Sequence, residues 1–466
     1  MSGEIEKIEV TRVLAKNILA IDYGMLSLSI VDVTKKLILD SLSCALAGSS
    51  TVGMESLNEL IKEWGGKEES TVVAFGSRVP GPNAALVNAS MGRALDFDDC
   101  HDIAIIHPAV PVVFASFATA EHKGVVSGKQ LITAVTLGID LACRMTAATL
   151  VNMLEGYGWD YSCIYGYFSS TAASAKILGL GLEEMLNAFG IASHQSAGIH
   201  SQLSLGNTTK AMGSGFAARG GVLSALMAQK GLTGSKEPLA GQWGIYDTYL
   251  RGAFNPKHLT TGLGKYFMVE NDSIKPYPCC RCIHPLIDAT LELVMQQDIR
   301  PEDIEKVTAY IGHGAYNVIA EPLELKQNPP TAIATQFSIP WALASTIIYR
   351  KAEIKHFLAE ALKDKDVHRL ARKVITKLDP ELTRDGIEPA VVRIVTRDKK
   401  IYSTRVDHAL GSPENPLSME KVVEKFRNCA DYAVTSISKE KLDQVVQMIN
   451  DLENISNVGQ TIQLLG

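Results

Sequence analysis

Residues 95–108 read LDFDDCHDIAIIHP and combine four aspartates with two histidines and a cysteine. Apolar runs precede it at residues 84–95 and follow it at residues 107–120. Acidic groups held between two buried segments are costly unless they are paired or used, because a low dielectric disfavours their charged form. The stretch is therefore a candidate active site, built from Asp96, Asp98, Asp99, Cys100, His101, Asp102 and His107.

A structural role is the alternative for any one of these aspartates. Asp98 or Asp99 is well placed to cap a helix that begins near Pro108, and Arg93 is a potential ion-pair partner. A helical terpene synthase that holds Mg²⁺ through the DFDD sequence is a further alternative. The aromatic content of 6% and the absence of a second metal motif argue against it.

The overall composition is that of a globular protein with two domains. At 466 residues the chain exceeds the usual size of a single core. The formal net charge of −6 argues against a nucleic-acid surface. The longest apolar run, residues 131–151, contains Asp140 and Arg144, and no signal peptide is recognisable. The eight scattered cysteines are typical of a reduced, cytoplasmic protein, so we expect neither a membrane nor a nucleic-acid partner.

Hydrophobic periodicity divides the chain into a helical and a mixed part. A β-like run at 70–76 interrupts helices that the pattern predicts over residues 10–23, 30–46, 54–64, 83–95, 111–122, 128–150, 169–178, 182–194 and 215–231. After residue 265 the hydrophobic pattern changes from purely helical to a mixture of helix and strand. From there the pattern predicts a helix at 288–297, a strand at 305–312, a long helical stretch over 331–380, a hairpin at 391–408 and two helices at 418–432 and 439–452.

This pattern predicts a mostly α protein. An all-helical domain is expected from both chain ends, residues 1–266 and 406–466. A smaller α+β lid domain, residues 267–405, is expected to be inserted between them. Such an insertion would bring segments that are distant in sequence to one cleft.

Two further loops carry polar groups that are candidates for the same site. In GYGWDYSCIYG, residues 156–166, Asp160 has aromatic neighbours, which raise a carboxyl pKa, although Asp160 is equally suited to cap a helix. In NTTKAMGSG, residues 207–215, Lys210 lies between a polar loop and a core segment. It can hold a carboxylate, and an exposed lysine is the plain alternative.

The loop KPYPCCRCIH, residues 275–284, brings Lys275, Arg281 and His284 into a short span. An arginine offers a bidentate fork to a carboxylate. The cysteines and the histidine also suggest zinc, but structural zinc draws on two spaced ligand pairs and no second pair is present, so we predict no metal. Together the four segments indicate a cofactor-independent site in which cations hold an anionic substrate while Asp and His move protons. The sequence has no nucleotide-binding or serine-hydrolase motif in a credible context.

These motifs resemble those of a known family. LDFDDCHDIAIIHPAVPVVFASFATAE resembles the first signature of the MmgE/PrpD family, and KPYPCCRCIHPLIDATLEL resembles the second. The segments at 213–234 and 412–426 are also similar to family sequences. The resemblance implies a homodimer with an active site in the cleft between a helical domain and a lid. It also implies proton transfer next to a carboxylate of a small di- or tricarboxylic acid, without metal or organic cofactor.

The resemblance also assigns roles to residues. It implies that Asp96, His107, Lys210 and Lys275 are active-site residues. We further expect Asp160 to share the proton transfers with His107, Asp96 to orient His107, and substrate contacts from Cys100, Cys280, Arg281 and His284.

Departures from the family pattern bear on the reaction. Decarboxylase-like members carry histidine where this chain has Asp160 and Gly213, threonine at Cys100, and histidine at Cys280. An aspartate at position 160 is similar to the methylcitrate dehydratases. We therefore expect dehydration of 2-methylcitrate or citrate. Three alternatives remain, namely a decarboxylase acting on cis-aconitate, an epimerase acting on iminodisuccinate, and a non-catalytic protein that binds organic acids.

Overall fold

The computed structural model describes residues 9–149, 157–203 and 207–466. The C-terminal end of the helix predicted at 128–150 and Gly156, the first residue of a predicted loop, lie outside the described residues. The protein is mostly α-helical with a smaller α+β part, as predicted. Among the described residues, no helix combines the length and the apolar character that crossing a bilayer requires.

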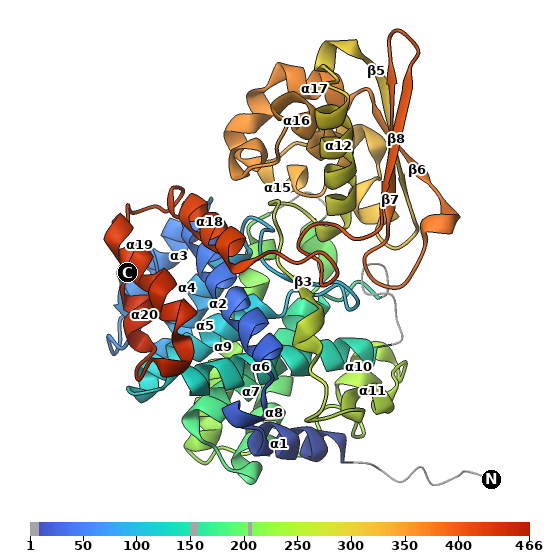
Figure 1. The fold of residues 1–466 in the computed structure, drawn as a ribbon. Helices are drawn as coiled ribbons and strands as arrows, with labels where there is room; N and C mark the ends of the chain where they lie inside the picture. The colour runs from blue at the N-terminus through green and yellow to red at the C-terminus, as the bar shows by residue number, and fades with distance from the viewer. Residues whose placement is uncertain (1–8, 150–156, 204–206) are drawn as a thin grey trace, which may run out of the picture.

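Long helices make up the first half of the chain (Figure 1). They are α1 Val10–Ala20, α2 Leu28–Gly48, α3 Met54–Trp64, α4 Gly81–Arg93, α5 Ala109–Lys123, α6 Gly128–Ala147, α7 Tyr161–Leu178, α8 Leu182–Ser193 and α9 Thr209–Gln229, followed by the short α10 Ile245–Leu250 and α11 Pro256–Thr260. Two short antiparallel pairs accompany them, β1 Ser70–Thr71 with β2 Arg78–Val79, and β3 Cys100–His101 with β4 Asp272–Ser273.

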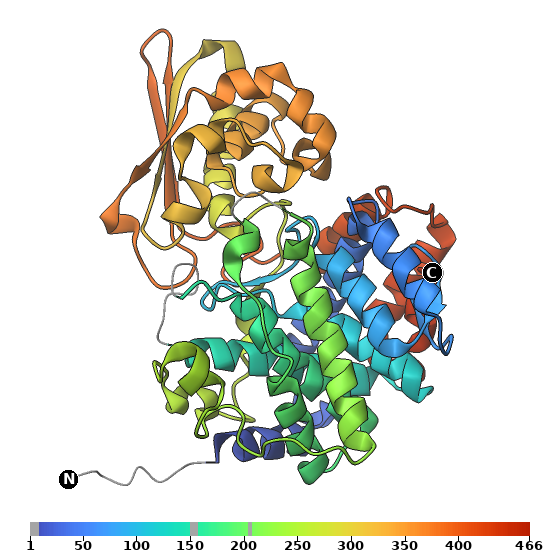
Figure 2. The ribbon, with the colours of Figure 1, turned by 180° about the vertical axis from the view of Figure 1, so that it is seen from behind.

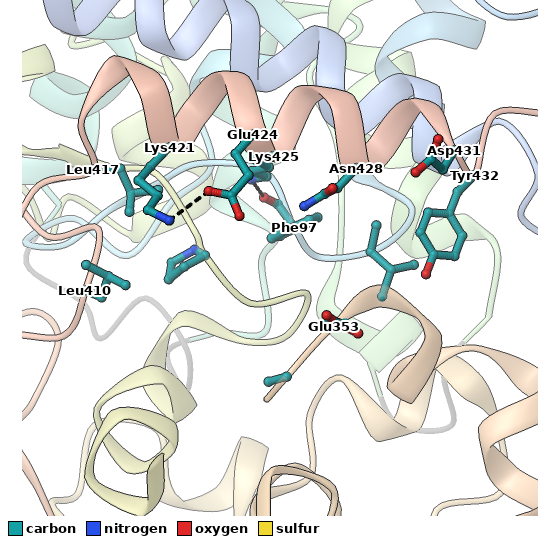
Figure 3. A pocket seen from close by; sticks show the side chains of 13 residues that line it. Phe97, Glu353, Leu410, Leu417, Lys421, Glu424, Lys425, Asn428, Asp431 and Tyr432 are labelled. Atoms are coloured by element: carbon teal, nitrogen blue, oxygen red, sulfur yellow. Dashed lines mark hydrogen bonds and ion pairs between the residues drawn. The ribbon is translucent and has the colours of Figure 1, made fainter. Parts of the chain in front are cut away.

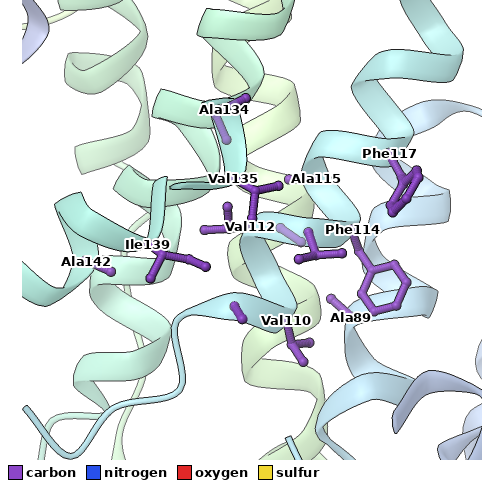
Figure 4. Close-up of a cluster of buried hydrophobic side chains, with 14 of the residues drawn as sticks. Ala89, Val110, Val112, Phe114, Ala115, Phe117, Ala134, Val135, Ile139 and Ala142 are labelled. Atoms are coloured by element: carbon purple, nitrogen blue, oxygen red, sulfur yellow. The ribbon is translucent and has the colours of Figure 1, made fainter. Parts of the chain in front are cut away.

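The core of this half lies between α5 and its neighbours (Figure 4). Val112 and Phe114 of α5 and Ile139 of α6 are fully buried. Burying side chains of this size contributes roughly 1.5–3 kcal/mol each. Small residues let the helices approach closely, since a Cβ added at Gly215 of α9 would lie 2.1 Å from the Ser90 Oγ of α4. This packing fixes the starts of α5 and α9 relative to the end of α4.

The α+β part follows, at the top of Figure 1. Its sheet has the order β6-β5-β7-β8, with β5 parallel to β6 and the other pairs antiparallel. Its hydrophobic core, formed by residues between Tyr277 and Ile394, is separate from the helical core. The elements are α12 His284–Gln296, β5 Ile304–Ile311, α13 Tyr316–Ile319, α14 Leu323–Gln327, α15 Ala332–Thr335, α16 Ile339–Tyr349, α17 Lys365–Ala371, β6 Val374–Leu378, β7 Ala390–Thr396 and β8 Ile401–Val406.

The chain then returns to the helical half, where the C-terminal helices lie beside α2 and α5 (Figures 1 and 2). These helices are α18 Met419–Ala430, α19 Lys439–Asn450 and α20 Gly459–Gln463. A buried ion pair joins Lys425 of α18 to Asp40 of α2, with 2.6 Å between Nζ and Oδ1. The domain limits 1–266 with 406–466, and 267–405, remain a prediction.

The predicted hairpin at 391–408 is confirmed as β7 and β8, and three other local predictions are wrong. The stretch 331–380 is not one helix, because it is interrupted by 3₁₀ turns and ends in strand β6. Residues 161–166 belong to α7, not to a loop, because Asp160 caps that helix eight residues earlier than the apolar pattern suggested. Lys210 likewise lies in the first turn of α9 rather than in a loop.

Candidate active site

A cavity lies where the helical half meets the α+β part. The cavity has a volume of about 60 Å³, which is enough for a few water molecules at ~10–15 Å³ each. Its walls come from the ends of α4, α7 and α9, the β3 loop and the turn before α12. The lining residues are Arg93, Asp96, Cys100, Ile105, Ile106, His107, Asp160, Tyr161, Ser162, His200, Lys210, Cys280, Arg281, Cys282, Val318 and Phe337.

Asp96 is the centre of a buried charge cluster at this cavity. Its Oδ1 lies 2.5 Å from Arg93 Nη1 and 2.7 Å from Lys210 Nζ, and its Oδ2 lies 2.9 Å from Lys275 Nζ. Lys275 also donates to the backbone carbonyl of Asp96, at 2.9 Å. Burial opposes the ionisation of Asp96, but Lys210, Lys275 and Arg93 outweigh it and hold its pKa well below the usual range.

The backbone at Asp96 explains how one carboxylate reaches three cations. Helix α4 ends at Arg93, and Asp96 has φ of +52°, the left-handed region that aspartate tolerates better than most residues. Such a conformation costs of order 1–3 kcal/mol and persists where the surroundings determine it. Here the three ion pairs hold it in place.

The charge cluster contains one cation more than it has carboxylates. Asp98 accepts from Arg93 Nη1 at 3.1 Å and is fully buried, so it is the second anion of the cluster. Arg93, Lys210 and Lys275 supply three positive charges against Asp96 and Asp98, which leaves a difference of one positive charge. A buried excess of positive charge favours an anionic ligand, and a carboxylate is the simplest one.

His107 lines the same cavity in a defined tautomer. Its Nδ1 donates to the backbone carbonyl of Asp99 at 2.6 Å, since a carbonyl can only accept, and Nε2 is then left with its lone pair. Burial, with the charges of Arg93 and Lys275, lowers the pKa of His107 to about 3. The imidazole is therefore neutral near pH 7 and can accept a proton at Nε2.

The orienting group of His107 differs from the one expected. Asp96 was expected to orient the ring, but the ring nitrogen Nδ1 contacts the Asp99 carbonyl and lies 3.7 Å from Asp98 Oδ2. Asp96 is occupied by its three cations. Asp98 is thus a carboxylate within ion-pair distance of the imidazole ring.

Asp99 has the structural role that its sequence position allowed. Its Oδ2 accepts from the backbone N–H of Ala109, the first residue of α5, at 3.0 Å. Its carboxyl group also faces that of Asp272 in β4, and two carboxyls can bond only by sharing a proton. Burial and the charge of Asp98 raise the pKa of Asp99 to about 8, and burial and Asp99 raise the pKa of Asp272.

Lys210 connects the charge cluster to the α+β part. Besides Asp96, its ammonium group donates to Gln336 Oε1 at 3.3 Å, and it lies 5.2 Å from the centre of the Phe337 ring. Burial and the nearby Arg93 lower the pKa of Lys210 to about 8. Lys210 therefore has partners in both halves of the molecule, Asp96 in the helical half and Gln336 and Phe337 in the α+β part.

Asp160 and the cavity cysteines lie where both a structural and a functional role are possible. Asp160 caps α7, with its Oδ1 accepting from the backbone N–H of Cys163 at 3.2 Å, and it also lines the cavity. Cys100 and Cys280 line the cavity as well, on opposite halves of the molecule.

Arg281 lines the cavity, whereas His284 is not among the lining residues, and both make contacts within the protein. Arg281 donates from Nε and Nη2 to both carboxylate oxygens of Asp102, at 3.0 and 3.1 Å. Its other donors reach His284 Nδ1, the Leu410 carbonyl and Ser273 Oγ, at 3.2, 2.9 and 3.3 Å, so all five N–H groups have partners. His284 is fully buried and donates from Nε2 to the Cys279 carbonyl at 3.2 Å. Arg281 therefore ties the β3 loop to the α+β part.

A larger pocket, about 370 Å³, lies behind the site between α18 and the α+β part (Figure 3). Its Lys425 makes three contacts, with Asp40 and with the carbonyls of Phe97 and Lys275 at 2.7 and 2.9 Å. The three donors of this ammonium are thus used to fix the two segments that carry Asp96 and Lys275. Lys425 thus has a structural role next to the site. The lining residues of this pocket do not include His107 or Lys210.

Several of these residues were missed by sequence reasoning. Asp102 was named only as one acid of the candidate site, and its pairing with Arg281, 179 positions away, was not predicted. Asp272, Gln336 and Lys425 gave no local signal, because each reaches the site through tertiary packing. Arg93 was expected only as an ion-pair partner, and this pairing is confirmed.

Comparison with known proteins extends over nearly the whole chain. The MmgE/PrpD N-terminal domain matches residues 12–257 and the MmgE/PrpD C-terminal domain matches residues 277–451. A cis-aconitate decarboxylase of Aspergillus terreus is 27% identical, covering 94% of this chain and 91% of that protein. The human cis-aconitate decarboxylase is 25% identical over 96% and 93%, and a 2-methylcitrate dehydratase of Salmonella typhi is 27% identical over 88% and 90%. With both domains matched, the chain belongs to the MmgE/PrpD family.

Proposed function

We propose that the protein is a cofactor-independent lyase that removes water from a small tricarboxylic acid, 2-methylcitrate or citrate, by abstracting a proton next to a carboxylate. One observation carries the proposal. A buried cluster with one excess positive charge shares a cavity with an imidazole that is neutral at pH 7. The first recruits a carboxylate, and the second accepts a proton from the adjacent carbon.

Substrate binding follows from the charge cluster. A carboxylate of the substrate would take up contacts with Lys210 and Arg93, which line the cavity, while Lys275 holds Asp96 from the far side. Hydrogen bonds to charged groups contribute about 1.5–3 kcal/mol each. Cys100 and Cys280 would contact the remainder of the substrate, on the two walls of the cavity.

The chemical step is assigned to His107 and Asp160. The Nε2 atom of His107 would take the α-proton, and the electron pair would spread onto the adjacent carboxylate, where Lys210 stabilises the added charge. Expulsion of the β-hydroxyl as hydroxide then forms the double bond, and Asp160 would assist its departure. Asp98 would stabilise the imidazolium formed meanwhile.

Decarboxylation of cis-aconitate is the second candidate, supported by the decarboxylase relatives that match 94% of the chain. Two positions favour dehydration. Decarboxylase-like members carry histidine at both position 160 and position 213. In this protein the two positions are adjacent, since a Cβ added at Gly213 would lie 3.6 Å from Asp160 Oδ2. The two histidines would thus be neighbours in a decarboxylase, and this chain has neither.

The test is proton NMR in deuterated water with citrate, 2-methylcitrate, cis-aconitate and iminodisuccinate, each incubated separately with the protein. Dehydration predicts loss of the methylcitrate or citrate signals with growth of an olefinic product. Loss of carbon dioxide from cis-aconitate would replace the proposal by decarboxylation. Deuterium exchange into iminodisuccinate without elimination would indicate epimerisation, and binding without any of these changes would indicate a non-catalytic protein. The homodimer and the cytoplasmic location remain predictions.

A further inference from the structure

Two cysteines at the cavity differ from the other six of the chain. All eight cysteines are free thiols, and all lie in described residues. Six of them are buried, while Cys280 and Cys282 are partly exposed and line the same cavity. The immediate neighbour Cys279 has no exposed surface. Solvent exposure therefore distinguishes Cys280 and Cys282 from the other six thiols.

The two side chains also influence each other's ionisation. The Cys282 thiol lowers the pKa of Cys280, and Cys280 raises the pKa of Cys282. Burial raises the pKa of Cys279 and of Cys100. Because the thiolate is the nucleophile, a lowered pKa and partial exposure both favour reaction at Cys280, and Cys282 lies two residues away at the same cavity.

The backbone brings the pair within range of a disulfide. Two steps of 3.8 Å set an upper limit of ~7.6 Å between the Cα atoms of residues two apart. The 3₁₀ turn that begins at Arg281 shortens this distance toward the roughly 4.4–6.8 Å that disulfides span.

We propose that Cys280 is an oxidant-sensitive modification site and that Cys282 resolves it to an intrachain disulfide in the cavity wall. The oxidant class is a hydroperoxide, whose smallest member, hydrogen peroxide, is close in size to the few water molecules for which the cavity has room. This inference goes beyond the proposed lyase activity and does not depend on it.

The reaction balances in two steps. The Cys280 thiolate attacks one oxygen of hydrogen peroxide, the O–O bond breaks, and a sulfenic acid and hydroxide form. The sulfur of Cys282 then attacks the sulfenic sulfur, hydroxide leaves, and its proton comes from the Cys282 thiol. Two thiols and one peroxide yield one disulfide and two waters.

The consequence lies in the turn between the two cysteines. Arg281 sits between them in sequence and holds Asp102 and the Leu410 carbonyl. A disulfide across this residue would shift the turn that carries its backbone. The cavity wall would then change on oxidation and recover on reduction.

The experiment maps thiols by peptide mass spectrometry on the intact chain. Brief alkylation with iodoacetamide should label Cys280 while Cys279 stays unlabelled, because Cys280 is partly exposed and Cys279 has no exposed surface. With stoichiometric hydrogen peroxide, the peptide containing 280–282 should lose two hydrogens and regain them with dithiothreitol. In Cys282→Ser, dimedone should trap a sulfenic acid at Cys280, and Cys279→Ser should behave like the wild type.

Three results would overturn the proposal. They are equal labelling of Cys279 and Cys280, first oxidation at any other cysteine, and direct oxidation of Cys280 to a sulfinic acid with Cys282 unchanged in the wild type. Alkylation and oxidation of the wild type decide the matter even if a variant does not fold. None of these readouts needs turnover, so they are separate from the test of lyase activity.

Discussion

Replacing Asp96 by asparagine removes one negative charge from the centre of the buried cluster. Asparagine has the same shape and accepts a positive φ, so the +52° backbone can be retained and the change is essentially one of charge. The substitution abolishes the ion pairs with Arg93, Lys210 and Lys275, which now span 2.5, 2.7 and 2.9 Å. Asp98 is then the one carboxylate left to balance the three cations, and the excess rises from one positive charge to two.

The expected cost follows from buried ion pairs in general. Removing one partner of a buried pair destabilises a protein by about 3–5 kcal/mol, because an uncompensated charge is left inside. The effect should be seen as a lower free energy of unfolding of the helical half, measured by urea titration at pH 7 with circular dichroism. Asp385→Asn, an exposed aspartate, is the matched control and should change this value by less than about 0.5 kcal/mol.

A ligand provides a second readout for the same variant. Citrate should restore part of the lost stability, since its carboxylates can occupy the place of the missing charge. A destabilisation below about 1 kcal/mol, or no difference from the Asp385 control, would refute the convergence of the three cations on Asp96.

Further predictions concern single groups of the site. His107→Gln should lower kcat about 10²–10⁴-fold, as expected for loss of a general base, with the far-ultraviolet circular dichroism unchanged. Lys210 is charged below its pKa of about 8, so kcat/KM for a polycarboxylate should fall as the pH rises through 8, and Lys210→Arg should remove this alkaline decline. Asp160→Asn should keep the cap of α7 but lose turnover, whereas Asp160→Ala should also lose about 0.5–2 kcal/mol of stability. Asp102→Asn should destabilise the protein by about 3–5 kcal/mol in urea titration, because it leaves Arg281 buried without its carboxylate, and the double variant with Arg281→Met should recover part of this stability.

Local signals were enough to predict much of the fold. The helix at Met54–Trp64 was predicted to the residue, since its apolar spacing is regular and a glycine lies on either side. The β7–β8 hairpin was evident from two alternating runs and a charged turn. In contrast, β6 was predicted as helix, because a five-residue strand packed parallel to β5 draws its stability from the sheet.

The residues of the site could be predicted, but the contacts between them could not. Asp96, Asp160, Lys210, His107 and Cys280 line one cavity, whereas Lys275, which was expected in the same site, is fully buried and is not among the lining residues. The pairing within the cavity was not predictable. Which carboxylate would face the imidazole, and which would neutralise an arginine, depends on atomic distances that residue types do not encode.

The most direct measurement is a crystal structure with propane-1,2,3-tricarboxylate, a polyacid that lacks the hydroxyl group and cannot be dehydrated. We predict one carboxylate within about 3 Å of Lys210 Nζ and an adjacent methylene carbon about 3–3.5 Å from His107 Nε2. A ligand bound away from Lys210, or one whose methylene carbons cannot reach His107 Nε2, would contradict the proposed roles of both residues.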